Sequence, residues 1–245
     1  MRGSRHERID KILVGRGLFP SREQAQRALM AGQVLVEEQR VDKPGQLVHA
    51  DAVIRVTGKE RFVGRGGYKL EAALEVFQVD PAGKRCLDVG ASTGGFTDCL
   101  LQRGALEVVA VDVGHNQLAY SLRTDARVSV FEGLNARYLR PEQVGAPFAV
   151  IVADLSFISL TLVLEPMFLC LQPGGCVIPL IKPQFELEQA KVGKGGVVRE
   201  DAYRLEAVDR VRRWVVEKLS REWLGVIESP IRGAKGNQEY LACLR

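Results

Sequence analysis

The chain has 245 residues, of which 46% are hydrophobic, and a formal net charge of +4. This length allows one large or two smaller globular domains, and no apolar run approaches the roughly 20 residues that a membrane helix needs. The N-terminus has no signal-peptide core, so we expect a cytoplasmic protein, and separately we expect a monomer. Five cysteines without a Cys-x-x-Cys motif suggest neither a disulfide framework nor a zinc site, and we expect them to be buried and free.

The positive charge is concentrated at the start of the chain. Residues 1–65 hold 13 Lys and Arg against 8 Asp and Glu, whereas residues 66–245 hold 21 against 22. Such asymmetry favours a nucleic-acid-binding module in front of a neutral catalytic domain. A merely solvated basic surface is the alternative, and charge alone leaves both open.

Residues 1–58 predict a small α+β module. An amphipathic helix should begin near Glu7 and end at Gly17, and a second, capped by Ser21, should run to Ala31. Short strands should follow around 34–36, 41 and 53–56.

A basic, glycine-rich stretch over residues 59–66 is expected to link this module to a second domain, 67–245. That domain should open with a helix from Tyr68. Lys69 then lies at the start of the helix, where the helix dipole disfavours a cation. The lysine is therefore either exposed and tolerated or placed for a task.

Residues 85–96 predict a cofactor loop between a buried strand and a helix. Glycines allow a sharp turn close to a ligand, and the free N-H groups of the helix would face that ligand. Asp88 at the strand end and Ser92 in place of a middle glycine favour S-adenosylmethionine over a dinucleotide, since an acid suits ammonium and sulfonium charges. An ordinary strand-turn-helix corner is the alternative.

A second strand, 107–112, ends in an acid that can accept both ribose hydroxyls of an adenosine cofactor. Asn135, after the third strand, could touch the adenine or could be a simple turn residue. The candidate cofactor-binding residues are Asp88, Gly90, Ala91, Ser92, Gly94, Gly95, Phe96, Asp112, Asn135 and Asp154.

The remaining elements alternate in type. Further strands are expected at 128–131, 148–153, 176–181, 224–228 and 240–244, with helical segments at 160–171 and 204–219. This alternation predicts an α/β domain with a mostly parallel, doubly wound, Rossmann-like sheet, in which ligands bind beyond the carboxyl ends of the strands.

Polar residues follow or flank several predicted strands, at the edge of the sheet where ligands are expected to bind. Asp154 and Lys182 directly follow apolar strands, and Glu239 precedes the last strand; with Lys69 they are the candidate catalytic residues. A lone acid after a strand is often a helix cap, but a lysine after a buried strand needs an acid such as Asp154 or Glu239 nearby. Two lysines and two carboxylates beside a methyl donor suit transfer to a ribose 2′-OH, with Lys182 as general base.

The sequence lacks the residues that methyltransferases use to methylate other acceptor atoms. No cysteine is placed as a nucleophile for base C5 methylation, and Asp-Leu-Ser-Phe at 154–157 replaces the Asn-Pro-Pro-Tyr type of loop used for amino groups. Residues 182–186, followed by 191–196, read as a basic, flexible lip that could close over RNA or be a solvated loop. The three histidines show no metal-ligand spacing, and no metal is expected.

The N-terminal residues resemble the S4 RNA-binding domain. The resemblance rests on Arg8-Ile-Asp10, Ser21-Arg22, Ala25, Ala28 and Gly32-Gln-Val34-x-Val36. It implies that the helical pair lies on RNA phosphates and grooves. The candidate RNA-binding residues are Arg5, Arg8, Lys11, Arg16, Ser21, Arg22, Arg27 and Arg65.

The order Lys69, Asp154, Lys182, Glu239 resembles the Lys-Asp-Lys-Glu tetrad of FtsJ-type ribose 2′-O-methyltransferases. With an S4-like module in front, the whole chain resembles the haemolysin A family of ribosomal RNA methyltransferases, through stretches such as 88–98, 154–159 and 182–186. The resemblance implies S-adenosylmethionine-dependent 2′-O-methylation of cytidine in RNA of one or both ribosomal subunits.

One stretch departs from the family pattern. His115-Asn116 stands where many relatives are expected to have Tyr-Gly, which puts local cofactor contacts in doubt. Two other functions are open at this point: a non-catalytic RNA-binding or ribosome-assembly protein, and, because of the family's name, a membrane-lytic protein, for which no inserting segment is found.

Overall fold

The computed structural model describes residues 6–58 and 61–245, which divide into one unit ending at Arg61 and a second beginning at Phe62. The linker expected over 59–66 lies outside the described residues at 59–60. From Phe62 onward it belongs to the second unit, because the Phe62 ring is buried in that unit's core. The predicted RNA-binding residue Arg5 also lies outside the described residues.

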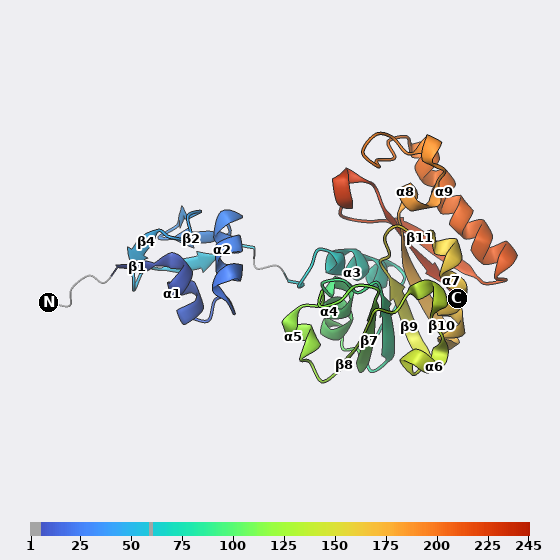
Figure 1. Ribbon diagram of the computed structural model, residues 1–245, viewed down its shortest axis with the longest axis horizontal. Helices are drawn as coiled ribbons and strands as arrows, with labels where there is room; N and C mark the ends of the chain where they lie inside the picture. Colours follow the sequence, from blue (N-terminus) through green and yellow to red (C-terminus); the bar gives the residue numbers. More distant parts are fainter. Residues whose placement is uncertain (1–5, 59–60) are drawn as a thin grey trace. The chain divides into compact units, whose positions relative to one another are not determined.

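The first unit is a small α+β fold (Figure 1). Its first helix begins later than the predicted position near Glu7, because residues 6–8 pair with 47–49 as a short strand. The Ser21 hydroxyl accepts a hydrogen bond from the Gln24 N-H at 3.3 Å, which confirms the predicted cap. The elements are β1 (His6–Arg8), α1 (Ile9–Gly15), α2 (Arg22–Met30), β2 (Val34–Val36), β3 (Gln39–Arg40), β4 (Leu47–His49) and β5 (Ile54–Val56).

The second unit is built on a seven-stranded sheet with the order β11-β12-β10-β9-β6-β7-β8. Only β12 runs against its neighbours, so the predicted mostly parallel α/β sheet is confirmed. The strands are β6 (Arg85–Val89), β7 (Glu107–Asp112), β8 (Val128–Glu132), β9 (Phe148–Ala153), β10 (Leu171–Ile181), β11 (Trp223–Glu228) and β12 (Tyr240–Leu244).

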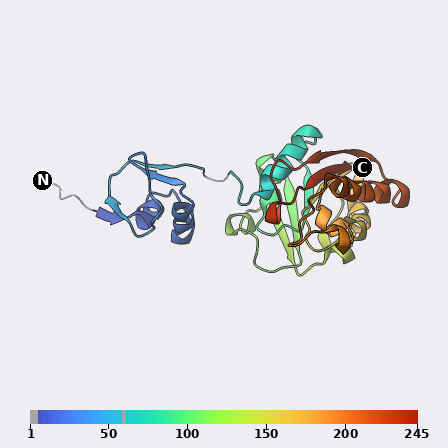
Figure 2. The ribbon, with the colours of Figure 1, turned by 90° about the horizontal axis from the view of Figure 1, so that it is seen from above.

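Helices cover both faces of this sheet (Figure 2). One face packs against α3 (Gly66–Val76) and α4 (Gly95–Gln102), and the other against α7 (Leu164–Leu169) and α9 (Asp201–Arg213). The shorter helical elements are α5 (Tyr120–Arg123), η1 (Ala136–Tyr138), α6 (Pro141–Val144), η2 (Leu160–Leu162), α8 (Pro183–Glu186), η3 (Gln189–Lys191), the π-helical turn η4 (Trp214–Lys218) and η5 (Ala234–Gly236).

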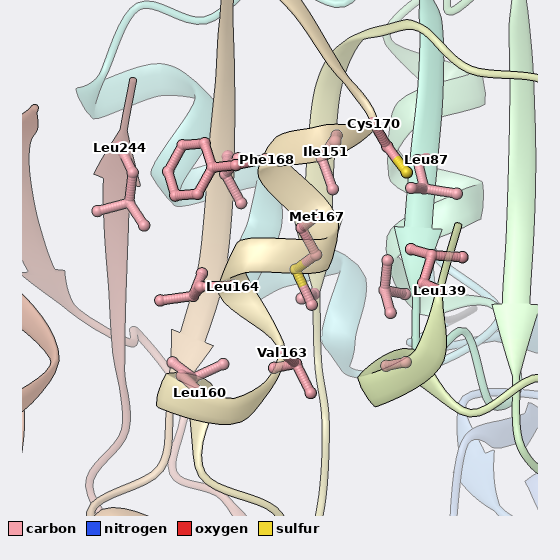
Figure 3. Close-up of a cluster of buried hydrophobic side chains, with 14 of the residues drawn as sticks. Leu87, Leu139, Ile151, Leu160, Val163, Leu164, Met167, Phe168, Cys170 and Leu244 are labelled. Carbon is pink, nitrogen blue, oxygen red and sulfur yellow. The ribbon is translucent and has the colours of Figure 1, made fainter. Parts of the chain in front are cut away.

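The core explains why these segments fold as they do. Val163, Leu164 and Met167 point from α7 and the turn before it onto Leu87 and Ile151 of the sheet (Figure 3). The amphipathic segment expected at 160–171 is thus confirmed as a helical layer, although it divides into η2 and α7 and its last residue starts β10. No helix among the described residues is long and apolar enough to cross a membrane.

The strand order decides where a ligand can bind. Connections from β6 run outward through β7 to β8, whereas β9 and β10 lie on the other side of β6. The carboxyl ends of β6 and β9 therefore form the switch point at which doubly wound sheets bind ligands. Because β12 is antiparallel to β10, with Tyr240 opposite Ile181, its amino end meets the same edge of the sheet.

Candidate active site

The turn between β6 and α4 forms one wall of a cavity of about 210 Å³. Gly90 and Gly94 have φ angles of 85° and 97° there, and Ser92 also lies in the left-handed region. A Cβ at Gly90 would stand 2.6 Å from the Asp154 carbonyl oxygen, so glycine is required for this close approach. The predicted loop residues that line the cavity are Gly90, Ala91, Ser92, Gly95 and Phe96, together with Asp154.

Asp88 lies beneath this loop and does not line the cavity. Its side chain is buried, and one oxygen accepts a hydrogen bond from the Thr97 hydroxyl at 2.7 Å. The other oxygen, Oδ1, is buried and has no hydrogen-bond partner. Burial raises the pKa of Asp88 to about 7, against a smaller opposing effect of the Thr97 hydrogen bond. The structure thus places Asp88 as a support of the loop and of the first turn of α4.

Asp112 and Asn135 also make contacts within the chain. The Asp112 carboxylate accepts the backbone N-H of Ser92 and that of Gly114, each at 2.7 Å, one on each oxygen. Each oxygen keeps a second lone pair for a ribose hydroxyl. Asn135 accepts the Arg137 N-H at 3.0 Å and caps η1, which matches the alternative reading of a turn residue.

The four candidate catalytic residues come together as two ion pairs. Lys182 Nζ lies 2.7 Å from Asp154 Oδ1, and Lys69 Nζ lies 2.6 Å from Glu239 Oε2. Side-chain exposure is 10% for Lys69 and 2% for Glu239, so this second pair is nearly withdrawn from solvent. Ser156 accepts a further hydrogen bond from Lys182 Nζ at 2.9 Å.

The topology explains this convergence. Asp154 and Lys182 follow the parallel neighbours β9 and β10, and Glu239 precedes the antiparallel β12 at the same edge. Lys69 reaches them from the first turns of α3, which packs beside β12. Gly233 makes room for the Glu239 carboxylate, because a Cβ added at Gly233 would lie only 1.8 Å from Glu239 Oε1.

A second cavity of about 240 Å³ is bordered by residues of both ion pairs. It is lined by Lys69, Lys182 and Glu239, and it shares Gly66, Ser156 and Lys182 with the cavity at the glycine loop. Lys182 therefore stands at the junction of two adjacent cavities, one bordered by the loop and one by the Lys69 and Glu239 pair. Arg65, expected to bind RNA, lines the second cavity.

Two phenylalanines in this cavity were not singled out individually from the sequence. Phe157 is 90% exposed and has a φ angle of 63°, which is unusual for a residue with a bulky side chain. It lies 5.2 Å from the ring of Phe185, centroid to centroid. The signal available in the sequence was the position of Phe157 three residues after the polar end of β9, but exposure and backbone angle were not readable there.

The second part of the predicted basic lip, residues 191–196, is held by contacts within the chain. Lys191 Nζ pairs with Glu206 at 2.5 Å, and Gly193 bonds to the Val197 carbonyl at 3.1 Å. Asn237, two residues before Glu239, accepts the N-H of the buried Val198 at 3.0 Å. Asn237 also donates a hydrogen bond to the Gly196 carbonyl at 2.8 Å, which ties residues 191–196 to the loop that carries Glu239. Residues 191–196 line neither cavity, whereas the first part of the predicted lip lines the second cavity through Lys182, Gln184 and Phe185.

In the first unit the predicted RNA-binding residues fall into two groups. Arg8 and Arg22 both bond to the buried Asp10 carboxylate, at 3.0 and 2.8 Å, and both remain about half exposed. The Arg8 guanidinium holds the pKa of Asp10 well below its usual range, against the effect of burial. The residues of the other group bond within the chain or lie exposed on the surface. Arg16 donates to the carbonyls of residues 50 and 52, and Arg27 pairs with Glu23. Ser21 caps a helix, and Lys11 is exposed.

The described residues hold no group of three or more His, Cys, Asp and Glu side chains placed to bind a metal ion. All five cysteines are buried, as predicted. Burial raises the pKa of Cys86 to about 12.

Comparisons with known proteins agree with this geometry. The family of FtsJ-like methyltransferases matches residues 62–245, and the S4 domain matches residues 7–54. The 16S/23S rRNA (cytidine-2′-O)-methyltransferase TlyA of Mycobacterium tuberculosis is 48% identical over 99% of this chain and 91% of its own length. Hemolysin A of Brachyspira hyodysenteriae is 42% identical over 96% and 98%. A solved structure of a protein described as a hemolysin, from Streptococcus thermophilus, has a TM-score of 0.75 and 41% identity and covers 99% of this chain and 89% of its own.

Proposed function

From the premise that the chain belongs to the FtsJ-like methyltransferases with an N-terminal S4 domain, we propose that it is a ribosomal RNA (cytidine-2′-O)-methyltransferase. The observation that carries this proposal is the position of Lys182. It lines both the cavity at the glycine loop and the cavity that holds the Lys69 and Glu239 pair. A methyl donor in the first cavity and a ribose in the second would meet at this lysine.

The glycine-loop cavity fits S-adenosylmethionine. The loop backbone approaches Asp154 so closely that a Cβ at Gly90 would fill the space, and Asp112 has lone pairs left for two ribose hydroxyls. When bound, the cofactor supplies an electrophilic methyl group on a positively charged sulfur. Asp154 at the border of the cavity favours that charge through the field of its carboxylate.

Lys182 is placed to move the proton of the reaction. The ribose 2′-oxygen gains a methyl group and loses its proton, which Lys182 Nζ accepts as general base after it has released its own proton. The resulting ammonium is stabilised by Asp154 Oδ1 at 2.7 Å and by Ser156 Oγ at 2.9 Å. Both contacts also restrict the direction in which Nζ points, which serves the in-line alignment that methyl transfer requires.

Lys69 and Glu239 hold the ribose in this scheme. Their ion pair is nearly buried and forms one wall of the acceptor cavity, so its remaining donors and acceptors face a bound sugar without being screened by water. The exposed Phe157 ring at the same cavity offers a surface on which a base turned out of its helix can stack.

The first unit supplies affinity for RNA. Asp10 holds the guanidinium groups of Arg8 and Arg22 side by side while each stays about half exposed. Fixed guanidinium groups suit phosphate oxygens, which they contact in pairs. Contacts of this kind position an RNA without reading its sequence.

The test is methyl transfer from labelled S-adenosylmethionine to ribosomal subunits that lack the modification. The wild type should label ribose at a cytidine, detected as a bond resistant to alkaline hydrolysis. Lys182→Met should lower kcat at least 100-fold, the order expected for loss of a general base. Lys218→Met, which removes an exposed lysine that lines neither cavity, is the matched control and should be fully active. Absence of transfer to any RNA, or full activity of Lys182→Met, contradicts the proposal.

A further inference from the structure

Two loops carry the reacting pair, and they are joined at two places. The loop after β9 contains Asp154 and Ser156, and the loop after β10 begins with Lys182. At the cavity, the contacts of Lys182 with Asp154 and Ser156 join the two loops. Away from the cavity, a buried carboxylate joins them again.

That carboxylate belongs to Glu186, whose residue exposure is 1%. Its Oε2 accepts the Ser159 hydroxyl at 2.6 Å, and its Oε1 accepts the Leu160 N-H at 2.8 Å. The Glu186 carbonyl oxygen in turn accepts Arg210 Nη1 of α9 at 2.5 Å. Glu186 therefore ties the end of the β9 loop to the β10 loop and to the helix behind them.

Packing does not account for an acid at this position. Burial raises the pKa of Glu186, against smaller opposing effects of its two hydrogen bonds and of the Arg210 charge, and in the described ranges 6–58 and 61–245 its carboxylate forms no direct ion pair with a Lys, Arg or His side chain. A buried carboxylate without such a partner costs stability that an apolar side chain of similar size would avoid. What the carboxylate provides is two directed hydrogen bonds, both to the β9 loop.

The geometry of α8 connects those bonds to the reaction. Lys182 is the residue before this single helical turn and Glu186 is its last residue, so the two stand at opposite ends of one turn. Pro183 follows Lys182 directly, and the Phe185 N-H bonds to the Lys182 carbonyl at 2.9 Å. The turn thus acts as a short rigid spacer, because proline fixes its first φ angle.

We infer that Glu186 is a positioning residue, which orients Lys182 toward the cavity by fixing the separation of the β9 and β10 loops. The inference rests on the proposed role of Lys182. Removing the two bonds lets the loops shift, and a displacement of about 1 Å at a reacting group costs on the order of 100-fold in rate.

The test compares Glu186→Ala, Glu186→Gln and Glu188→Gln. Glu186→Ala should lower kcat between about 10- and 100-fold, while the Kd for S-adenosylmethionine and the KM for ribosomal subunits stay within about threefold. Glu186→Gln keeps an acceptor for the Leu160 N-H and should recover most of kcat. Glu188→Gln removes an exposed neighbouring charge and should behave as the wild type.

A purely structural role has a different signature. In that case cofactor affinity falls together with kcat, and the loss follows the fraction of unfolded protein measured by tryptophan fluorescence, which overturns the inference. Should Glu186→Ala fail to fold, Ser159→Ala removes one of the two bonds instead. The kcat of Ser159→Ala and its Kd for S-adenosylmethionine are then compared with those of Glu186→Gln.

Hydrogen exchange separates this inference from the proposed function. Even if the wild type methylated no RNA, Glu186→Ala should speed amide exchange in segments 154–160 and 182–187 and leave β9 protected. Unchanged protection of those segments refutes the positioning role whatever the enzyme's activity.

Discussion

The buried Asp88 predicts an unusual dependence of stability on pH. Its carboxyl group is fully buried below the cofactor loop, one oxygen is without a partner, and burial raises its pKa from 3.8 to about 7. We expect Asp88→Asn to remove this dependence. The amide keeps an oxygen to accept the Thr97 hydroxyl and leaves one polar atom unpaired, as in the wild type, so the substitution changes mainly the charge.

The magnitude follows from proton linkage. The folded state binds the Asp88 proton more tightly than the unfolded state does. The stability that this proton gives the folded state is therefore fully present below about pH 4 and is lost as the pH rises toward 7. Integrating between pH 5 and pH 8 gives a loss of about 3 kcal/mol from the free energy of unfolding. The difference between Asp88→Asn and the wild type should therefore grow by about that amount, in favour of the variant, over the same range.

Urea unfolding followed by tryptophan fluorescence measures this difference. Both tryptophans of the chain, Trp214 and Trp223, lie in the second unit, so the signal reports the unit that contains Asp88. Glu165→Gln, which removes an exposed acid from that unit, is the matched control and should run parallel to the wild type. A constant difference between Asp88→Asn and the wild type from pH 5 to pH 8 would refute the reasoning.

Three further substitutions test other parts of the site. Gly90→Ala should weaken S-adenosylmethionine binding at least tenfold by calorimetry, because its Cβ would stand 2.6 Å from a carbonyl oxygen; unchanged affinity would contradict the close approach. Phe157→Ala should raise the KM for RNA about tenfold, the worth of one stacked base, and leave cofactor affinity unchanged. Asp10→Asn should free the guanidinium groups of Arg8 and Arg22, weaken RNA binding roughly tenfold and flatten its salt dependence by about one phosphate contact; an unaltered salt slope would show that Asp10 does not organise them.

Local signals predicted most of the elements. Strands β9 and β12 begin and end where apolar runs do, and the glycines of the β6 to α4 turn were recognisable because only glycine adopts their backbone angles at little cost. The start of α1 was displaced because residues 6–8 pair with a strand some 40 residues later, which no local pattern reveals. The S4 and FtsJ-like resemblances rested on motifs, and the matching families confirm both resemblances.

The sequence by itself determined which polar residues meet. Asp154 and Lys182 follow apolar strands, and alternating strands and helices put the carboxyl ends of parallel strands at one edge. Only the tertiary structure decided their partners: Lys182 with Asp154, Lys69 with Glu239, Asp88 with Thr97 below the loop, and Glu186 with the end of the β9 loop. The physical reason is that periodicity reports which face of an element is buried, whereas pairing across 170 residues depends on strand order and direction, here on the one antiparallel strand, β12, that brings Glu239 to the site.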